Sequence, residues 1–414
     1  MPSFRKLWLA ALAIFLLAAL TGAFMRFGIL YGMAGLNYAN VRHAHSHLMY
    51  FGWVTPALMA LLAAYLPHLT GLPVTTGQST TTTLPRLIAL VIGLGLLAYV
   101  PFLLFGYNAA EIGRARLPLS VMAATLNVLA WYAFALVYRR GDLHRPVAGT
   151  PLSHPVWLWN AAVAFLLLAT LGVIGLPVVI LTGIGDPFWS LFFTHLFLDL
   201  FSEGWLVLGV LGLAYAANPA AARHPWARRG GELLVAGLPV IFLLYLPVNF
   251  TPAVARWIGS IGGLLVVAGT MANVVALWPV AGPRWRAPLA FLAIKAAMQA
   301  LILLPPLARW AENSLLRIPY LHWLLLGFVT LGLFAAAEER WARASASRID
   351  QLGPVARSGS AWPRSDLRAV RSGASTSYGR SGGDHEPDHD VDCDRSPRPA
   401  RGVHPVPGRA AQPR

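Results

Sequence analysis

Long apolar runs separated by short polar or proline-containing breaks fill the chain up to about residue 340. A helix needs about 20 apolar residues to cross a hydrocarbon core about 30 Å thick, and the runs have about this length. The pattern therefore predicts about ten membrane-spanning helices, at residues 7–25, 44–66, 87–106, 117–138, 156–180, 189–215, 233–249, 257–279, 287–308 and 319–337.

The composition agrees with an all-α integral membrane protein, since 57% of residues are hydrophobic and only 12% are charged. We expect a polytopic transmembrane domain at 1–341. From residue 342 to residue 414 the chain is rich in Arg, Ser, Gly and Pro and lacks apolar periodicity, which predicts a disordered tail. The single cysteine, Cys393, lies in this tail, so an intrachain disulfide and a thiolate metal cluster are excluded.

The distribution of basic residues predicts the orientation of the helices. Arg5 and Lys6 precede the first span, and the even-numbered spans end in basic loops. Cytoplasmic loops carry the excess of Lys and Arg, so both termini should be cytoplasmic. We expect a multi-pass protein of a bacterial inner membrane. The loop cations that support this orientation are Arg139, Arg140, Arg145, Arg223, Arg228, Arg229, Arg284, Arg286, Arg340 and Arg343.

A net charge of +15 would suggest nucleic acid as the partner of a soluble protein. Here most of the excess is loop and tail arginine, which faces the cytoplasm and anionic lipid. The expected partners are therefore the lipid bilayer and electron-donor or other membrane subunits, with no nucleic acid.

Five histidines fall at one predicted depth, near the outer ends of spans 2, 6 and 10. Imidazole is costly in hydrocarbon and is a good ligand for iron, copper and zinc, so the set is a candidate for holding a metal or haem. A membrane interface is also where a single structural histidine costs little. The five residues are His43, His45, His47, His195 and His322.

Helical spacing divides the first three of these histidines. His43 and His47 are four residues apart and share a helix face, whereas His45 points elsewhere. A regular helix therefore supplies one or two ligands to a single centre from this segment, not three.

A stripe of ionisable residues descends span 6. His195, Asp199 and Glu203 repeat every four residues, and Lys295 and Gln299 in span 9 have the same spacing. Carboxylates in a membrane must face the interior and be protonated, paired or hydrated. We expect Asp199 and Glu203 to handle protons in catalysis, with Lys295 tuning their charge. The alternative is a polar network that only fixes helix packing.

Aromatic and small residues around the histidines would suit a flat porphyrin slot, although aromatic residues at this depth also form the ordinary interfacial belt. Haem propionates need cations at the rim of such a slot. Arg42 and Arg317 are placed to provide them.

Two short segments resemble a known family. His45-Ser46-His47-Leu48-Met49-Tyr50-Phe51-Gly52 is similar to the His-Ala-His-x-Met-x-Phe-Gly signature of NnrS proteins, and 321–330 is similar to their later Leu-His-x-x-x-x-Gly segment. The resemblance implies a multi-span haem and copper membrane protein tied to nitric oxide metabolism. More distantly, a span-2 histidine before Phe-Gly resembles subunit I of haem-copper oxidases and nitric oxide reductases.

The departures from these families limit the expected cofactors. Span 10 has one histidine where an oxidase supplies two, and no adjacent His-His pair occurs in a following span. One b-type haem, with copper as a candidate second metal, fits better than a complete binuclear centre. We expect His47 and His322 as axial ligands, with His45 and His195 as alternates or copper ligands.

Three functions stay open at this point. The first is a haem protein of respiratory or nitric oxide chemistry, acting either as an oxidoreductase or in electron transfer, sensing or cofactor delivery. The second is a proton-coupled secondary transporter that uses Asp199, Glu203 and Lys295; inverted repeats would favour it, but no convincing internal repeat is seen. The third is a structural subunit without a cofactor.

Overall fold

The computed structural model describes residues 4–70, 78–140, 153–314 and 316–351. The expected tail, together with Cys393, lies almost wholly outside these residues. The described residues form one compact unit, which ends at Gln351.

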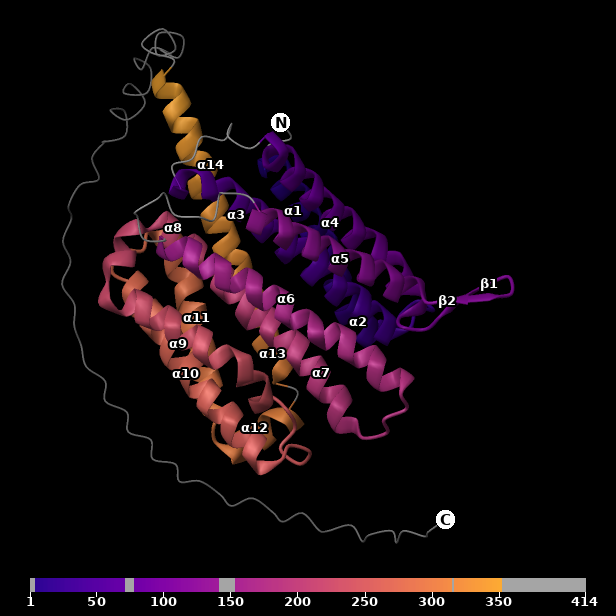
Figure 1. Cartoon of the computed structure of the whole chain (residues 1–414). Helices are drawn as coiled ribbons and strands as arrows, with labels where there is room; N and C mark the ends of the chain where they lie inside the picture. The colour runs from indigo at the N-terminus through magenta and orange to yellow at the C-terminus, as the bar shows by residue number, and fades with distance from the viewer. Residues whose placement is uncertain (1–3, 71–77, 141–152, 315, 352–414) are drawn as a thin grey trace, which may run out of the picture. The chain divides into compact units, whose positions relative to one another are not determined.

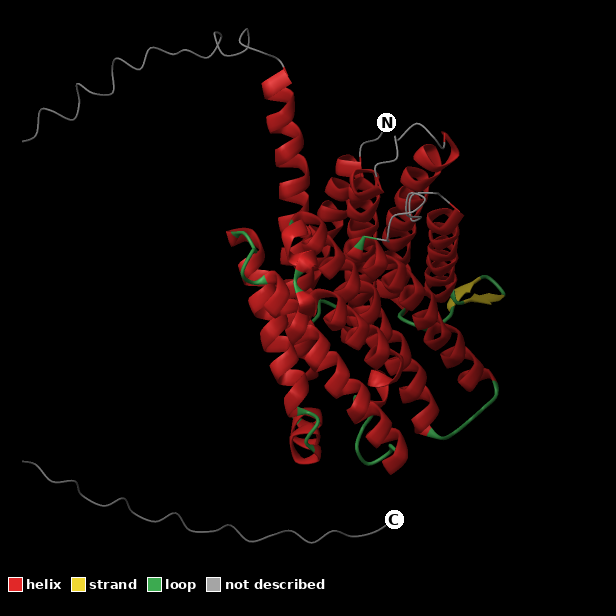
Figure 2. Ribbon diagram, turned by 60° about the vertical axis from the view of Figure 1, so that its left-hand side comes forward, coloured by secondary structure: helices red, strands yellow, loops and turns green. Residues whose placement is uncertain are grey.

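Helices make up nearly all of this unit, and they run mostly side by side (Figure 1). A short antiparallel hairpin, β1 (Ala110–Ile112) with β2 (Ala115–Leu117), projects at one end (Figure 2). The α-helices are α1 (Phe4–Tyr31), α2 (Tyr38–His47), α3 (Thr55–Thr70), α4 (Gln78–Phe105), α5 (Leu119–Arg140), α6 (His154–Leu181), α7 (Pro187–Asp199), α8 (Leu208–Ala217), α9 (Pro225–Ile241), α10 (Ala253–Leu277), α11 (Pro283–Leu301), α12 (Pro305–Asn313), α13 (Arg317–His322) and α14 (Leu331–Gln351).

The expected all-α polytopic bundle is confirmed, but the expected count of ten spans is not. Eight described helices are long and apolar enough to cross a membrane, or nine if α11 and α12, which are bent by 111°, form one span. The span expected at 233–249 corresponds to α9, a helix of 17 residues that ends at Ile241 and passes into a 3₁₀ turn, Phe242–Leu244. The start of α1 and the end of α14 lie at the same end of the bundle (Figure 1).

Three composite spans form the core. Each joins two α-helices through a π-helical segment: η1 (Leu48–Val54) between α2 and α3, η3 (Leu200–Val207) between α7 and α8, and η6 (Trp323–Thr330) between α13 and α14. These spans are 100%, 89% and 61% buried, against 28–56% for the other five. Wide π-turns inside α-helices frequently mark functional sites.

The three π segments share a pattern of residues and contacts. Each contains a glycine, at 52, 204 or 327, followed by an aromatic residue. The indole of Trp53 donates a hydrogen bond to Thr330 Oγ1 at 3.2 Å, and that of Trp205 donates to Thr55 Oγ1 at 3.3 Å. Phe328 and Val207 occupy the positions of a third such pair, and both are apolar. The two positions that match between the core spans are thus one and three residues after the glycine.

A peripheral helix covers each of these glycines. A Cβ on Gly52 would lie 2.8 Å from Ile14 of α1, one on Gly204 would lie 2.5 Å from Phe165 of α6, and one on Gly327 would lie 2.4 Å from Phe291 of α11. In each case a helix that comes earlier in the chain packs on the glycine of the core span; for the third span this helix is α11, and α12 lies between them in the chain. The three core spans therefore share one local pattern of residues and packing.

Candidate functional site

Polar side chains stand just before or at the start of each π segment. Five positions before the glycines at 52, 204 and 327 stand His47, Asp199 and His322. These three residues therefore have the same position relative to the glycine of their core span. Their surroundings differ, so the candidate residues belong to separate clusters of side chains.

His45 and His322 form the first of these clusters. Nδ1 of His45 lies 2.9 Å from the carbonyl oxygen of Ala18, and Nδ1 of His322 lies 2.8 Å from that of Ile318. A carbonyl only accepts, so each Nδ1 carries a proton, and Nε2 is the ring nitrogen left to bind a ligand. The two imidazoles lie within electrostatic range of each other, and His322 is exposed although it lies in a membrane span.

A glycine in α1 lets the His45 ring approach that helix. A Cβ on Gly22 would lie 3.0 Å from Cε1 of the imidazole, so a larger residue would push the ring away. The carbonyl of Ala18, one turn earlier, then fixes the orientation of the ring. A hydrogen bond from Nδ1–H to a backbone carbonyl is the support that metal-ligating histidines usually have.

His43 and His47 lie on the other face of α2, as their spacing predicts. The His47 ring stacks on Phe102 with 3.7 Å between centroids, and its Nε2 lies 3.4 Å from the hydroxyl of Tyr107. The His43 ring packs edge-on against Tyr107 as well. Burial raises the pKa of Tyr107, so the hydroxyl that contacts His47 is a neutral phenol.

A buried ion pair joins the second core span to α11. Lys295 Nζ donates to Glu203 Oε2, and the two side chains are 0% and 3% exposed. Lys295 also donates to Oε1 of Gln299 at 2.8 Å. The pairing expected between the stripe of span 6 and Lys295 is therefore present for Glu203.

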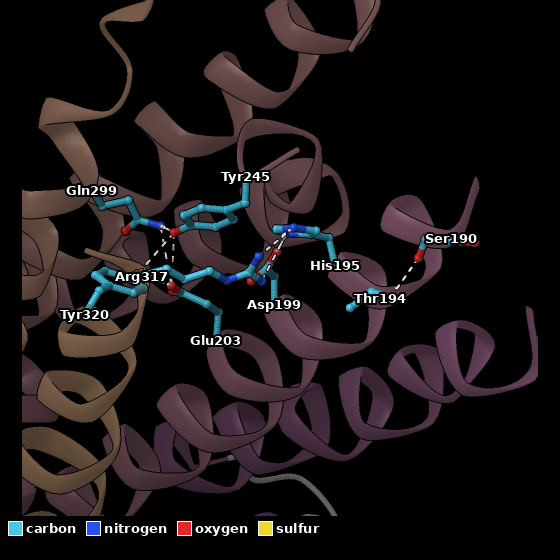
Figure 3. A network of polar contacts seen from close by, with 9 residues as sticks. All are labelled: Ser190, Thr194, His195, Asp199, Glu203, Tyr245, Gln299, Arg317 and Tyr320. Carbon is cyan, nitrogen blue, oxygen red and sulfur yellow. Dashed lines mark hydrogen bonds and ion pairs between the residues drawn. The ribbon is translucent and has the colours of Figure 1, made fainter. Parts of the chain in front are cut away.

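Two tyrosines and an amide surround the other oxygen of Glu203 (Figure 3). Tyr320 donates to Oε1 at 2.8 Å, with the hydroxyl of Tyr245 at 3.4 Å and Nε2 of Gln299 at 3.5 Å. The two tyrosine hydroxyls are 3.1 Å apart, and Gln299 donates to Tyr245 at 2.5 Å. Both carboxylate oxygens are thus satisfied, as a buried charge requires.

His195 belongs to an adjoining cluster (Figure 3). The Arg317 guanidinium donates to Nε2 at 2.8 Å, and Nδ1 lies 3.0 Å from Oδ2 of Asp199. Arginine has no acceptor, so Nε2 accepts and Nδ1 donates its proton to the carboxylate. Both nitrogens of His195 are therefore engaged within the protein.

The two clusters act as one electrostatic unit. Asp199 lies within electrostatic range of both Lys295 and Tyr245. Formally, two cationic side chains, Lys295 and Arg317, balance two acidic ones, Asp199 and Glu203. We call this set, with Tyr245, Gln299, Tyr320 and His195, the charged network.

The expected residues are thus brought together only in part. Arg317 contacts His195 instead of standing free at a rim, and Arg42 is exposed on α2. Within the described part of the chain, no group of three or more His, Cys, Asp or Glu side chains is arranged to hold a metal ion. The five histidines divide between the His45 and His322 pair, the Tyr107 face and the charged network.

No protein-family model matches the chain, and no curated protein sequence is significantly similar to it. Membership of the NnrS or oxidase families therefore stays a prediction. What the structure itself shows is a polytopic helical bundle with apolar helices long enough to cross a membrane, a buried charged network, and two histidines, of which His45 is half-buried and His322 exposed.

Sequence reasoning missed Tyr245 and Tyr320. Tyr320 stands two residues before His322, so it projects from a different side of the same helix. That spacing was the available signal. Tyr245 follows the 3₁₀ turn after α9, and only the folded chain brings it to Glu203.

Proposed function

We propose that this protein is a membrane haem protein that holds one b-type haem between His45 and His322. The observation that carries the proposal is the hydrogen bonding of these two imidazoles. In each ring Nδ1 donates to a backbone carbonyl, and Nε2 has no hydrogen-bond partner among the residues that the structure describes. Two imidazoles that each present Nε2 are the donor set of a bis-histidine haem. The resemblance to NnrS proteins and oxidase subunits favours respiratory or nitric oxide chemistry in a bacterial inner membrane.

His45 suits this role better than His47, which the sequence favoured. The Nε2 of His47 contacts Tyr107, and its ring is stacked on Phe102 on the opposite face of α2. Gly22 lets the His45 ring pack against α1, and His322 is exposed within a span. A bound haem would supply reversible one-electron transfer at this place.

The charged network would serve the same function by holding and moving protons. Glu203 stands between an ammonium group and the Tyr320 hydroxyl, and His195 links Arg317 to Asp199. Such chains of ionisable residues in a membrane are typical of proton relays. Copper stays a candidate second metal, with His43 and His47 as its remaining donors.

Removal of either proposed ligand is expected to abolish the haem signal. The full chain, purified in detergent, should show a reduced-minus-oxidised spectrum of a b-type haem with low-spin axial ligands. We expect His45→Ala and His322→Ala to lose this signal, and His322→Gly to regain it when imidazole is added. A wild-type protein that stays colourless after haem is supplied would contradict the proposal.

Two histidine variants serve as controls. His47→Ala lies on the same helix and His224→Ala on an exposed loop, and neither contacts the proposed pair. Both should keep the full spectrum. If His47→Ala abolishes the signal and His45→Ala does not, then the ligand assignment is wrong although the haem proposal stands. Helix content by circular dichroism shows which variants are folded.

A second candidate function rests on the charged network alone. A fully buried Lys–Glu pair with tyrosine neighbours also suits a proton-coupled secondary transporter. In liposomes with an imposed proton gradient, a transporter should carry a solute or dissipate the gradient without haem, and Glu203→Gln should stop it. Equal flux in Glu203→Gln and wild-type liposomes would rule out this alternative.

A further inference from the structure

Arg256, near the start of α10, has a guanidinium without an acceptor. Its two terminal nitrogens are shielded from solvent and have no hydrogen-bond partner. The residue lies at the end of the bundle that holds the 245–252 loop and α12. A guanidinium carries a permanent charge and several donors, so a shielded one is costly unless an anion meets it.

The neighbouring charges leave this place positive. Arg309 and Glu312, both on α12, lie within electrostatic range of Arg256. Glu312 already accepts a hydrogen bond from the backbone nitrogen of Val248 at 3.1 Å, and the structure shows no hydrogen bond or ion pair between it and Arg256. Arg256 and Arg309 therefore lie near a single carboxylate, Glu312, which already accepts a hydrogen bond from the backbone of Val248.

The surface around Arg256 is strongly apolar. Val254 and Trp257 on the same helix are 70% and 72% exposed, and Ile261, one turn further, is 60% exposed. On α12, Trp310 is 60% exposed. Since α12 is bent by 111° from α11, it crosses the direction of the spans. Exposed tryptophans beside basic residues at the end of a span are typical of the membrane interface.

We infer that Arg256 and Arg309 bind the phosphate group of an anionic phospholipid. The phosphate oxygens would accept from the unpartnered guanidinium nitrogens of Arg256, which suit bidentate recognition of phosphate. The acyl chains would lie along Val254, Trp257 and Ile261. The net positive charge of Arg256, Arg309 and Glu312 together favours an anionic headgroup over a zwitterionic one. This inference does not depend on the proposed haem.

The test is the stabilisation of the purified full chain by added lipid. After delipidation in detergent, thermal unfolding is followed while phosphatidylglycerol, phosphatidylcholine or inorganic phosphate is added. We expect wild-type protein to be stabilised most by phosphatidylglycerol. Arg256→Gln should need about tenfold more of this lipid for half-maximal stabilisation, since a charge-assisted hydrogen bond is lost. Native mass spectrometry should show one tightly bound lipid fewer.

Arg114→Gln is the matched control, because Arg114 is exposed on the β1–β2 hairpin. It should respond to the lipid as wild type does. Arg256→Lys, which keeps the charge, should have an intermediate affinity and guards against misfolding of Arg256→Gln. An unchanged lipid response in Arg256→Gln would overturn the inference, and so would equal stabilisation by inorganic phosphate and phosphatidylglycerol, which would indicate a site for free anions.

Discussion

Lys295→Met is expected to destabilise the folded protein by about 3–5 kcal/mol, because it leaves the carboxylate of Glu203 buried without its cation. Both side chains are almost fully buried, so water cannot replace the lost partner. Tyr320 and Gln299 still donate to the carboxylate, but neutral donors do not balance its charge. The loss should appear as reduced resistance of the helical circular dichroism signal to denaturant.

A double variant separates the pair from its surroundings. Lys295→Met combined with Glu203→Gln removes both charges while keeping an acceptor for Tyr320, so it should be more stable than Lys295→Met alone. The exposed pair Arg228 and Glu232, with 2.8 Å between nitrogen and oxygen, is the control. Arg228→Gln should cost less than about 1 kcal/mol. A cost of Lys295→Met no larger than this, or additive costs in the double variant, would show that the buried pair is not coupled.

The charged network could be predicted in part because ionisable residues in an apolar run are conspicuous. A spacing of four residues placed His195, Asp199 and Glu203 on one face, and the cost of buried charge required partners for them. Which partner each one takes depends on how helices far apart in the chain are packed. Spacing within one helix therefore could not assign Lys295 to Glu203 and Arg317 to His195.

The histidines show the same limit. Spacing separated His45 from the face of His43 and His47, and the structure shows that separation. The choice between the two faces depends on neighbours from α1 and from the loop after α4, namely the Ala18 carbonyl and Tyr107. These contacts link residues far apart in sequence, so the pattern within 43–47 cannot reveal them.

Apolar run lengths predicted the class of fold but not the pattern that the three core spans share. Any helix in a bilayer needs a similar run, so hydropathy does not distinguish core spans from peripheral ones. The shared pattern rests on one glycine and its neighbours in each core span, and Phe328 and Val207 occupy the positions of a third Trp–Thr pair. Too few residues match for the sequence alone to show it. The bend between α11 and α12 arises at Leu304 and Pro305, within a run that reads as one span.

Close contact between α4 and η1 leads to the other large effect. A Cβ on Gly95 would lie 2.8 Å from the Cα of Gly52 and 2.9 Å from its nitrogen, and backbone atoms cannot rotate away. We expect Gly95→Val to destabilise the protein by about 3 kcal/mol, because the helices must separate along their whole contact. The shift would also move α2, which continues into η1 and carries His45, so the proposed haem should be lost in parallel.

Gly93→Val is the matched control for this change, since it is the same substitution two residues earlier on the same helix. No atom lies within 4 Å of a Cβ built there, so its stability should stay within about 0.5 kcal/mol of wild type. Thermal unfolding of the two variants in one detergent measures the difference. If they unfold at the same temperature, then the contact between Gly52 and Gly95 does not hold α4 against the first core span, and the geometry that presents His45 must come from α1 alone.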